Sequence, residues 1–364
     1  MLITLLGAGH IGQTIALWLH RCGDYRITVL DQSPAALAPL AAQGLRTQVV
    51  NSRDADALRQ QLTGQTAVIN ALPYDQAIAT AGVAAACGCH YFDLTEDVAA
   101  TRAIAALARE ARTAFMPQCG LAPGFIGIVA HHLAQGFDTL DELKMRVGAL
   151  PAFPTNALKY NLTWSVDGLI NEYCHPCEAI HHGQRIEVLP LEGLEHFSLD
   201  GTEYEAFNTS GGLGTLCETL QGRVRTLDYK SVRYPGHRDR MALLLHDLQL
   251  QSDTDTLKAI LRRAVPSTMQ DVVLVFVTVS GRREGRFMQE VFARKIFAQR
   301  DGPQPLSAIQ ITTAAGVCAA VDLFRAGRLP QRGFIRQEQL ALPEVLANRF
   351  GQAYQQSRQV QSIG

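Results

Sequence analysis

The chain lacks an excess of charge of one sign, long apolar runs and a disulfide pattern. Its 364 residues carry 33 Lys and Arg against 34 Asp and Glu, so no global field favours nucleic acid. The first apolar run covers only residues 2–6, which is too short for a secretory leader or a membrane span. Eight cysteines in a chain of this length predict reduced thiols. We therefore expect a cytoplasmic protein that binds neither nucleic acid nor membrane.

A glycine-rich turn stands near the start of the chain. Residues 7–12 read GAGHIG, between a strand-like run at 2–6 and a helical pattern at 13–21. This context is the one that a dinucleotide-binding turn needs, because the glycines permit the turn, the approach of a pyrophosphate and close helix packing. The helix N-terminus would hold the phosphates. The cofactor contacts expected here are Gly7, Gly9, His10, Ile11 and Gly12.

An acidic residue follows the second predicted strand, at 26–30. Asp31 can accept hydrogen bonds from both ribose hydroxyls of an adenosine, and its charge repels a 2′-phosphate. Gln32 and Ser33 come next and supply no cation for such a phosphate. We therefore predict NAD, in preference to NADP, as the cofactor.

Strands and helices continue to alternate up to residue 117. Further strands are predicted at 47–50, 66–72, 90–94 and 113–117, with helices near 54–62, 75–87 and 97–112. Six strands with intervening helices predict an α/β fold, a doubly wound Rossmann sheet of parallel strands. Ligands of this fold meet the carboxyl ends of the strands. Further cofactor contacts are therefore expected from Asn70, Ala71, Leu72, Pro73 and Cys119.

After residue 124 the pattern changes to α+β. Two long strands at 271–280 and 286–298, joined by a charged turn at 281–285, predict a hairpin in a substrate or dimerisation sheet. Because long exposed edges demand cover, we expect a homodimer. The expected domains are a nucleotide-binding domain at 1–123, an inserted α+β substrate and dimerisation domain at 124–305, and a C-terminal helical segment at 306–364 that returns to the first domain.

Segments along nearly the whole chain resemble the saccharopine dehydrogenase (reductase) family, and within it lysine 6-dehydrogenases most of all. They are GAGHIG at 7–12, NALPY at 70–74, HYFDLTED at 90–97, QCGLAPG at 118–124, LKYNLTWSVDGLINEY at 158–173, NTSGGLGT at 208–215, VRYPGH at 232–237 and GRLPQRGFIRQE at 327–338. The resemblance implies a nicotinamide-dependent oxidoreductase acting on the CH–NH group of an amino acid. In lysine 6-dehydrogenases NAD oxidises the lysine ε-amine, which yields 2-aminoadipate 6-semialdehyde and ammonia.

The resemblance leaves alternatives open. Members that handle saccharopine carry a glycine-rich run where this chain has residues 156–160, which favours lysine or another diamine. A saccharopine-type reductive condensation of an amino acid with an oxo acid or semialdehyde is the second possibility. A catalytically silent NAD-binding protein is the third.

The chemistry needs a group that accepts a proton from a cationic amine, because hydride leaves only when the attached nitrogen is neutral. Asp93 and Glu96 follow the strand at 90–94 and are the first candidates. A helix-capping role is an equal alternative for Asp93. His237, after Pro-Gly, is the other candidate base, unless it is only a turn residue.

The substrate carboxylate needs cations, hydroxyls or backbone N–H groups. The candidates are Lys159, Tyr160, Thr209, Ser210, Arg233 and Arg238. Arg238 lies beside Asp239, so a solvated surface position is its alternative. Cys174 and Cys177, with two histidines nearby, resemble a compact zinc cluster but lack a second separated pair, so no metal is predicted.

Overall fold

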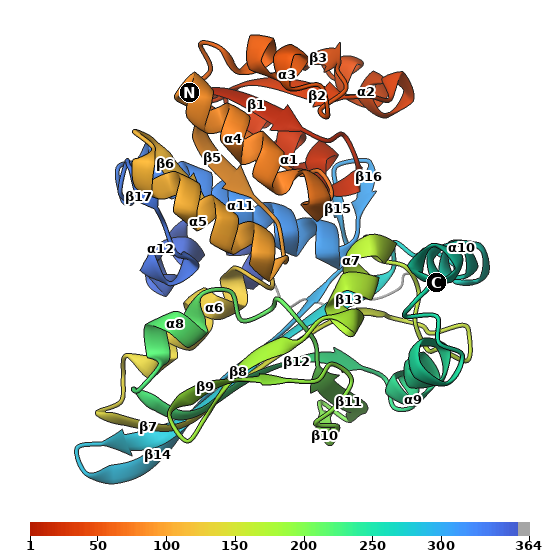
Figure 1. The fold of residues 1–364 in the computed structure, drawn as a ribbon, viewed down its shortest axis with the longest axis vertical. Coiled ribbons are helices and arrows are strands. Elements are labelled where there is room, and N and C mark those ends of the chain that lie inside the picture. The colour runs from red at the N-terminus through yellow and green to blue at the C-terminus, as the bar shows by residue number, and fades with distance from the viewer. Residues whose placement is uncertain (356–364) are drawn as a thin grey trace. The chain divides into compact units, whose positions relative to one another are not determined.

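A computed structural model describes residues 1–355, which form two compact units (Figure 1). Unit 1 contains residues 1–125 and 312–353, and unit 2 contains residues 126–311 and 354–355. The division falls inside one continuous helix, α11 (Ala308–Arg325). Of the C-terminal segment expected at 306–364, residues 356–364 lie outside the described part of the chain.

Unit 1 is built on a sheet of seven parallel strands in the order β17-β6-β5-β4-β1-β2-β3. The strands are β1 (Leu2–Leu6), β2 (Arg26–Asp31), β3 (Arg46–Val49), β4 (Ala67–Asn70), β5 (His90–Asp93), β6 (Ala114–Met116) and β17 (Gly333–Phe334). The predicted doubly wound parallel sheet is confirmed. The seventh strand, β17, pairs Gly333 with Ala114, and its two residues are too few for a periodic pattern in the sequence.

The helices of unit 1 lie on the faces of this sheet. They are α1 (His10–Arg21), α2 (Pro34–Ala41), α3 (Ala55–Leu62), α4 (Ala77–Cys87), α5 (Val98–Glu110), α11 and α12 (Leu342–Ala347), with the short helical turns η1 (Tyr74–Gln76), η3 (Gln337–Gln339) and η4 (Gly351–Gln355). Helices α3, α4 and α5 share one apolar cluster with the strands. By length and composition α11 could cross a membrane, but 83% of it is buried inside the structure.

Unit 2 is built on a mixed sheet whose main path runs β10-β11-β12-β7-β13-β14, with β8 pairing with β12 and β9. The strands are β7 (Thr139–Pro151), β8 (Cys177–His181), β9 (Gln184–Val188), β10 (Glu195–Leu199), β11 (Thr202–Asn208), β12 (Val224–Arg233), β13 (Asp271–Arg283) and β14 (Arg286–Phe297). A separate pair consists of β15 (Gln299–Asp301) and β16 (Gln304–Leu306). The expected second α+β domain is thus confirmed.

The turn of the long hairpin was predicted to begin at residue 281, and this start is wrong. Residues 281–283 belong to β13, and only Glu284 and Gly285 connect the strands. A Cβ at Gly281 would lie 2.1 Å from the carbonyl oxygen of Thr139 on β7. This glycine therefore serves a close approach of two strands, and not the turn.

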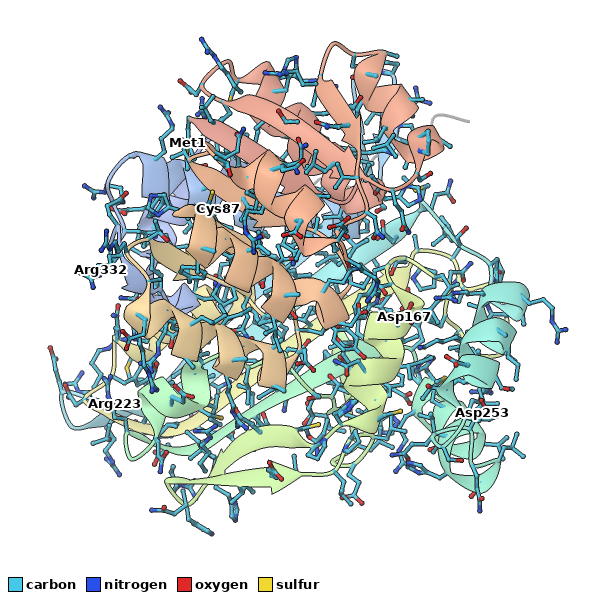
Figure 2. All side chains as sticks on the ribbon, turned by 45° about the horizontal axis from the view of Figure 1, so that its top comes forward. Met1, Cys87, Asp167, Arg223, Asp253 and Arg332 are labelled. Carbon is cyan, nitrogen blue, oxygen red and sulfur yellow. The ribbon has the colours of Figure 1, made fainter. Side chains whose placement is uncertain are left out.

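The helices of unit 2 are α6 (Phe125–Ala134), α7 (Val166–Cys174), α8 (Leu216–Leu220), α9 (His237–Ala242), the π-helical turn η2 (Leu243–Asp247) and α10 (Thr254–Ala264). Asp167 on α7, labelled in Figure 2, forms ion pairs with Lys258 at 3.1 Å and Arg262 at 2.7 Å on α10. Apolar residues of both helices, such as Leu169 and Leu257, share one core cluster. This packing fixes α7, which carries part of the candidate site.

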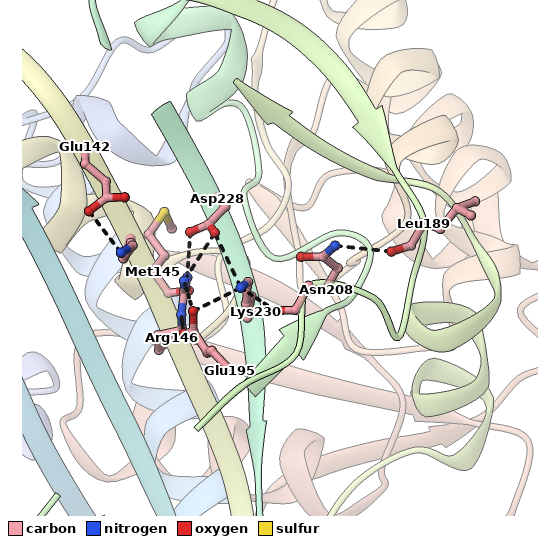
Figure 3. A network of polar contacts seen from close by, with 10 residues as sticks. Glu142, Met145, Arg146, Leu189, Glu195, Asn208, Asp228 and Lys230 are labelled. Carbon is pink, nitrogen blue, oxygen red and sulfur yellow. Dashed lines mark hydrogen bonds and ion pairs between the residues drawn. The ribbon is translucent and has the colours of Figure 1, made fainter. Parts of the chain in front are cut away.

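A charge network crosses the sheet of unit 2 (Figure 3). Arg146 on β7 is 1% exposed and donates to Asp228 on β12 at 2.7 Å and to Oε2 of Glu195 at 3.1 Å. Lys230 on β12 donates to the same Glu195 oxygen at 3.0 Å. Since Glu195 begins the outer strand β10, the network ties that strand to the middle of the sheet.

Candidate functional site

The glycine-rich turn lies between β1 and α1 in unit 1. Gly7 adopts a φ of +96°, and a Cβ at Gly12 would lie 2.0 Å from the carbonyl oxygen of Gly7. Both positions therefore require glycine for the turn itself. At Gly9, by contrast, a Cβ would meet no atom within 4 Å, and Gly9 and His10 are exposed while Ile11 is half-buried. The turn thus leaves open the place that a pyrophosphate needs at the N-terminus of α1.

The carboxylate of Asp31 lies at the end of β2, beside this turn. Its Oδ2 accepts a hydrogen bond from the backbone N–H of Ala8 at 2.7 Å, and its Oδ1 accepts one from Ser33 at 2.8 Å. Each carboxylate oxygen can accept a second hydrogen bond. Asp31 is therefore oriented by the protein and retains acceptor capacity for ribose hydroxyls.

The loop after β4 packs against the glycine-rich turn. The carbonyl oxygen of Ala71 lies 2.8 Å from the place where Gly7 would carry a Cβ. Oδ1 of Asn70 accepts from the backbone N–H of Leu72 at 3.1 Å, which shapes the loop that ends in Pro73. The predicted cofactor contacts of this loop, Asn70, Ala71, Leu72 and Pro73, thus lie together with those of the glycine-rich turn.

Asp93, at the end of β5, is 1% exposed, and protein donors occupy both of its carboxylate oxygens. Oδ1 accepts from the backbone N–H groups of Thr95 at 3.0 Å and Gln118 at 2.9 Å, and Oδ2 accepts from the hydroxyl of Tyr91 at 2.8 Å. Burial raises the pKa of Asp93 to about 6. Asp93 thus connects the loops after β5 and β6. The geometry favours a positioning role over proton transfer.

The alternative that Asp93 caps the next helix is wrong. Asp97 caps α5 instead, since its carboxylate accepts from the backbone N–H of Ala100 at 2.6 Å. The cap lies four residues later because the loop after β5 continues through Glu96 before the helix begins at Val98.

Glu96, in the loop between β5 and α5, is the carboxyl group that suits proton transfer. It is half-buried, and within residues 1–355 no other residue forms a hydrogen bond with its carboxylate. Burial in the first place, and the like charges of Asp97 and Asp93 in the second, raise its pKa to about 7. A carboxyl group that titrates near neutral pH can both accept and return a proton.

Cys119 is packed inside unit 1. Its thiol lies 3.1 Å from the carbonyl oxygen of Met116 and 3.6 Å from Nε2 of Gln337, which also donates to Pro117. Burial raises the pKa of Cys119, so its thiol is protonated and is no nucleophile. Gln337, from the C-terminal part of unit 1, was missed by sequence reasoning although it lies in the segment 327–338 quoted for the resemblance.

A second group of polar residues lies in unit 2, on β12, α7 and α9. Nε of Arg233 donates to the hydroxyl oxygen of Tyr173 at 2.9 Å, and that hydroxyl lies 3.1 Å from Nε2 of His237. Nδ1 of His237 lies 2.9 Å from the carbonyl oxygen of Leu158. Because a carbonyl only accepts, Nδ1 carries the proton and Nε2 accepts from Tyr173.

This arrangement keeps His237 neutral. The side chain is 0% exposed, and burial first, with the charge of Arg233 second, lowers its pKa to about 3. Both ring nitrogens are engaged within the protein, so the predicted role as the direct base is not the one that the geometry favours. His237 instead orients the hydroxyl of Tyr173.

Arg233 is a buried cation with one free edge. It is 3% exposed, its guanidinium lies 5.3 Å from the ring centre of Tyr160, and its Nη1 donates to the carbonyl oxygen of Val232 at 2.8 Å. Within residues 1–355, Nη2 forms no hydrogen bond. The buried side-chain oxygens of Asn161 and Asn171 also have no hydrogen-bond partner there. These two buried oxygens require a polar ligand or water.

A buried carboxylate accompanies this cation. Glu172 on α7 is buried. The pKa of Tyr229 on β12 is raised mainly by the burial of Tyr229, and next by the charge of Glu172. The charge of Glu172 also helps to raise the pKa of Arg233, after larger contributions from Tyr173 and Tyr160. Sequence reasoning missed Glu172 and Tyr173, although both lie in the segment 158–173.

The other predicted substrate residues are engaged in protein contacts. Nζ of Lys159 donates to the carbonyl oxygen of Pro235 at 3.0 Å, and Nε of Arg238 donates to that of Leu191 at 2.7 Å. Arg238 is half-buried, and its hydrogen bond holds the loop at Leu191. The alternative of a fully solvated surface position does not describe it.

The two predicted hydroxyl groups are buried and paired. The hydroxyl of Thr209 lies 2.8 Å from that of Ser231, and the hydroxyl of Ser210 donates to the carbonyl oxygen of Pro176 at 3.0 Å. Of the predicted substrate residues, the structure thus brings Tyr160 and Arg233 into the cluster of His237.

Glu205 on β11 orients the turn that carries His237. Its carboxylate accepts from the backbone N–H groups of Gly236 and Arg238, each at 2.6 Å. A buried acceptor of two N–H groups at the start of α9 fixes that helix. Nothing in the local sequence of β11 indicates this role.

Two family models match the chain. The saccharopine dehydrogenase NADP binding domain matches residues 3–116, and the saccharopine dehydrogenase C-terminal domain matches residues 120–352. The chain belongs to the saccharopine dehydrogenase family. It is accordingly an NAD(P)-dependent oxidoreductase of this family, and the resemblance inferred from its segments is confirmed.

A solved structure shows the same fold. Apo saccharopine dehydrogenase (L-Glu forming) from Saccharomyces cerevisiae matches with a TM-score of 0.77 and 17% identity, over 94% of this chain and 95% of that chain. A myo-inositol dehydrogenase from Corynebacterium glutamicum matches with a TM-score of 0.47 and 14% identity, over 98% of this chain and 96% of that chain. A TM-score of 0.47 is too low for the myo-inositol dehydrogenase to support an argument about this chain.

Proposed function

We propose that this protein uses NAD to oxidise the CH–NH group of an amino acid, foremost the ε-amine of L-lysine, to 2-aminoadipate 6-semialdehyde and ammonia. The observation that carries the substrate class is the free Nη2 edge of the buried Arg233. A buried cation needs an anionic partner, and a guanidinium edge suits a carboxylate. Glu172 supplies the opposite charge, which suits the α-ammonium of the same amino acid.

The choice of NAD over NADP depends on Asp31. The glycine-rich turn would hold the pyrophosphate and Asp31 the adenosine ribose, and the bound nicotinamide would supply the hydride acceptor. The carboxylate of Asp31 repels a 2′-phosphate, which supports NAD although the matching family model is named for NADP.

Glu96 is the group that we assign to proton transfer. Glu96 would accept one proton from the substrate ammonium, and the nicotinamide, when bound, would supply the acceptor for the hydride that the neutral amine releases. Water adds to the resulting imine, and ammonia leaves. A pKa of about 7 makes the carboxylate available at neutral and alkaline pH.

The test is to mix the purified protein with NAD and L-lysine at mildly alkaline pH and to measure NADH and ammonia together. Arg233→Lys retains the charge but loses the planar guanidinium, so KM for lysine should rise much more than kcat falls. Asp31→Ala should raise KM for NAD and relax the preference against NADP.

Two outcomes would overturn the proposal. Consumption of NADH only when lysine and 2-oxoglutarate are supplied together would identify a reductive condensation. Tight NAD binding without turnover of any amine would identify a catalytically silent protein.

A further inference from the structure

The side chain of Gln13 connects the glycine-rich turn to helix α2 in unit 1. Gln13 lies on α1, one residue after Gly12, and is half-buried. Its Nε2 donates to the carbonyl oxygen of Ala8 at 2.9 Å and to that of Ala36 at 3.3 Å. Because a carbonyl oxygen only accepts, these two bonds fix the amide with its nitrogen toward both carbonyls. Gln13 thus holds the first turn of α2 against the glycine-rich turn.

The two hydrogen bonds of Gln13 complete a closed ring of five residues. The backbone N–H of Ala8 donates to Oδ2 of Asp31 at 2.7 Å, and Oδ1 of Asp31 accepts from the backbone N–H of Ser33 at 2.8 Å. The hydroxyl of Ser33 accepts from the backbone N–H of Ala36 at 3.3 Å, and the carbonyl oxygen of Ala36 accepts from Gln13. The glycine-rich turn, the end of β2 and the first turn of α2 therefore form one hydrogen-bonded unit.

This ring fixes the carboxylate that is expected to hold the adenosine ribose. Each oxygen of Asp31 accepts one hydrogen bond from a backbone N–H group of the ring, so the carboxylate is held between the turn and α2. Loss of the Gln13 amide would open the ring at both Ala8 and Ala36. Two ribose hydroxyls require acceptors in fixed positions, and such positions depend on the groups that support the binding residue.

The ring also leaves few donors for a 2′-phosphate at the N-terminus of α2. A helix N-terminus binds phosphate through its free N–H groups. Pro34, the first residue of α2, has no N–H. The N–H of Ser33 is bonded to Asp31, and that of Ala36 to the hydroxyl of Ser33. The closed ring is therefore a second barrier to NADP beside the charge of Asp31.

We propose that Gln13 is a positioning residue which, given the proposed use of NAD, sets the preference for NAD over NADP by closing this ring. Gln13 acts through Asp31, whose carboxylate it keeps in place for the ribose hydroxyls. The cofactor preference thus depends on a residue of α1 that lies outside both the glycine-rich turn and the acid at the end of β2.

The first experiment measures the dissociation constants of NADH and NADPH by fluorescence titration of the full chain without lysine. Gln13→Met keeps an unbranched side chain of similar length and removes both donated hydrogen bonds. The dissociation constant of NADH should rise by about two- to tenfold. That of NADPH should not rise, because its 2′-phosphate gains nothing from Asp31. The preference for NADH over NADPH should therefore fall.

A second variant opens the same ring at another member. Ser33→Ala removes the acceptor of the Ala36 N–H and leaves that donor free for a phosphate. The preference for NADH should again fall. Because one break suffices to open the ring, Ser33→Ala combined with Gln13→Met should reduce NADH affinity by less than the product of the two separate effects.

The matched control is the same kind of change at a glutamine outside the ring. Nε2 of Gln43, which follows α2, donates to the carbonyl oxygen of Pro39 at 3.5 Å, and Gln43 is exposed. Gln43→Met should leave both dissociation constants unchanged. Thermal unfolding without nucleotide shows for each variant whether its fold is intact.

The second experiment asks whether Gln13 acts through Asp31. Asp31→Ala removes the ribose acceptor, so adding Gln13→Met to it should change the dissociation constant of NADH by less than about twofold. The same fold-loss with and without Asp31 would overturn the proposal, since Gln13 would then act on the cofactor by another route.

The proposal and the cofactor choice on which it rests fail in different ways. A wild type that prefers NADH, together with an unchanged preference in Gln13→Met and in Ser33→Ala, would overturn the role of Gln13 and leave the use of NAD in place. A wild type that binds NADPH more tightly than NADH would overturn the choice of NAD itself, and the role of Gln13 with it.

Discussion

The hydroxyl of Tyr173 lies 3.1 Å from Nε2 of His237. Because Nδ1 of that imidazole faces a carbonyl oxygen, the tyrosine must donate its proton to the histidine, and its oxygen is free to accept from Arg233. Three side chains from three elements thus form one chain of hydrogen bonds with a single direction. These hydrogen bonds hold the guanidinium of Arg233 in a position that leaves its Nη2 without a hydrogen-bond partner within residues 1–355.

Removal of the Tyr173 hydroxyl should destabilise unit 2. Tyr173→Phe leaves Nε of the buried Arg233 and Nε2 of His237 without a partner, which should lower the free energy of unfolding by about 1–3 kcal/mol. Urea denaturation measures the loss. Tyr204→Phe is the matched control, since within residues 1–355 the hydroxyl of Tyr204 forms no hydrogen bond, although its ring is buried. Equal losses in both variants would contradict the hydrogen-bond chain.

The buried imidazole should make stability depend on pH. The pKa of His237 falls from 6.5 to about 3 in the folded chain, so between these values the unfolded chain binds a proton that the folded chain does not. The contribution of His237 is therefore full above pH 6.5 and declines as the pH falls, by up to about 1.4 kcal/mol per pH unit.

The comparison of wild type with His237→Asn isolates this group from the other titrations. Between about pH 7 and about pH 5, the unfolding free energy of the wild type should fall by about 2 kcal/mol relative to that of His237→Asn. A difference that stays constant with pH would show that folding does not lower the pKa of His237.

Glu96 should determine the acid limb of the activity profile. A base with a pKa of about 7 predicts that kcat/KM rises as the pH increases through that value. Glu96→Gln should remove this limb and lower kcat by about 10²–10⁴-fold. Asp97→Asn removes a like charge and should shift the limb to lower pH. An unchanged limb in Glu96→Gln would assign the base to another residue.

Two glycines of the nucleotide-binding turn should respond differently to the same substitution. Gly12→Ala forces a Cβ to within 2.0 Å of a backbone oxygen, so both the free energy of unfolding and the affinity for NADH should fall, the former by about 1–3 kcal/mol. Gly9→Ala meets no protein atom within 4 Å, so its stability should hold while the NADH dissociation constant rises about tenfold or more. Fluorescence titration with NADH and thermal unfolding separate the two effects. Unchanged affinity in Gly9→Ala would place the pyrophosphate elsewhere.

The charge network of Figure 3 should be worth more than an exposed pair on the same strand. Arg146→Met leaves the partly buried carboxylates of Asp228 and Glu195 without their main cation and should cost about 3 kcal/mol of unfolding free energy. Lys144→Met breaks the exposed pair with Glu142 and should cost less than about 1 kcal/mol. Similar losses in both variants would show that burial adds nothing to the network.

The nucleotide-binding unit could be predicted in detail because its signals are local. The turn from Gly7 to Gly12 and the acid at Asp31 belong to one strand-turn-helix-strand unit, so neighbouring residues in the sequence are also neighbours in space. The buried strands are apolar on both faces and are recognised as short continuous runs. β17 escaped prediction because its pairing depends on a distant strand and its own two residues carry no pattern.

The candidate site in unit 2 could be predicted only as a set of residue types. Arg233 and His237 were found because they lie in one segment, but Tyr173 and Glu205 come from α7 and β11. The roles of Asp93 and Asp97 could not be told apart either, because each is an acid before the same helix and only the loop geometry assigns the cap.

The sequence alone determined the parallel nucleotide-binding sheet, its glycine-rich turn and the family, since these depend on patterns within short stretches of chain. Only the tertiary structure decided which carboxylates are engaged, which edge of Arg233 is open and which nitrogen of His237 carries the proton. The arrangement of Arg233 and His237 depends on hydrogen bonds between residues 60 or more positions apart, such as Arg233 and Tyr173, and no local pattern encodes such contacts. The carboxylate of Asp93 is engaged partly by Gln118, 25 positions away, which a pattern within one short stretch does not encode either.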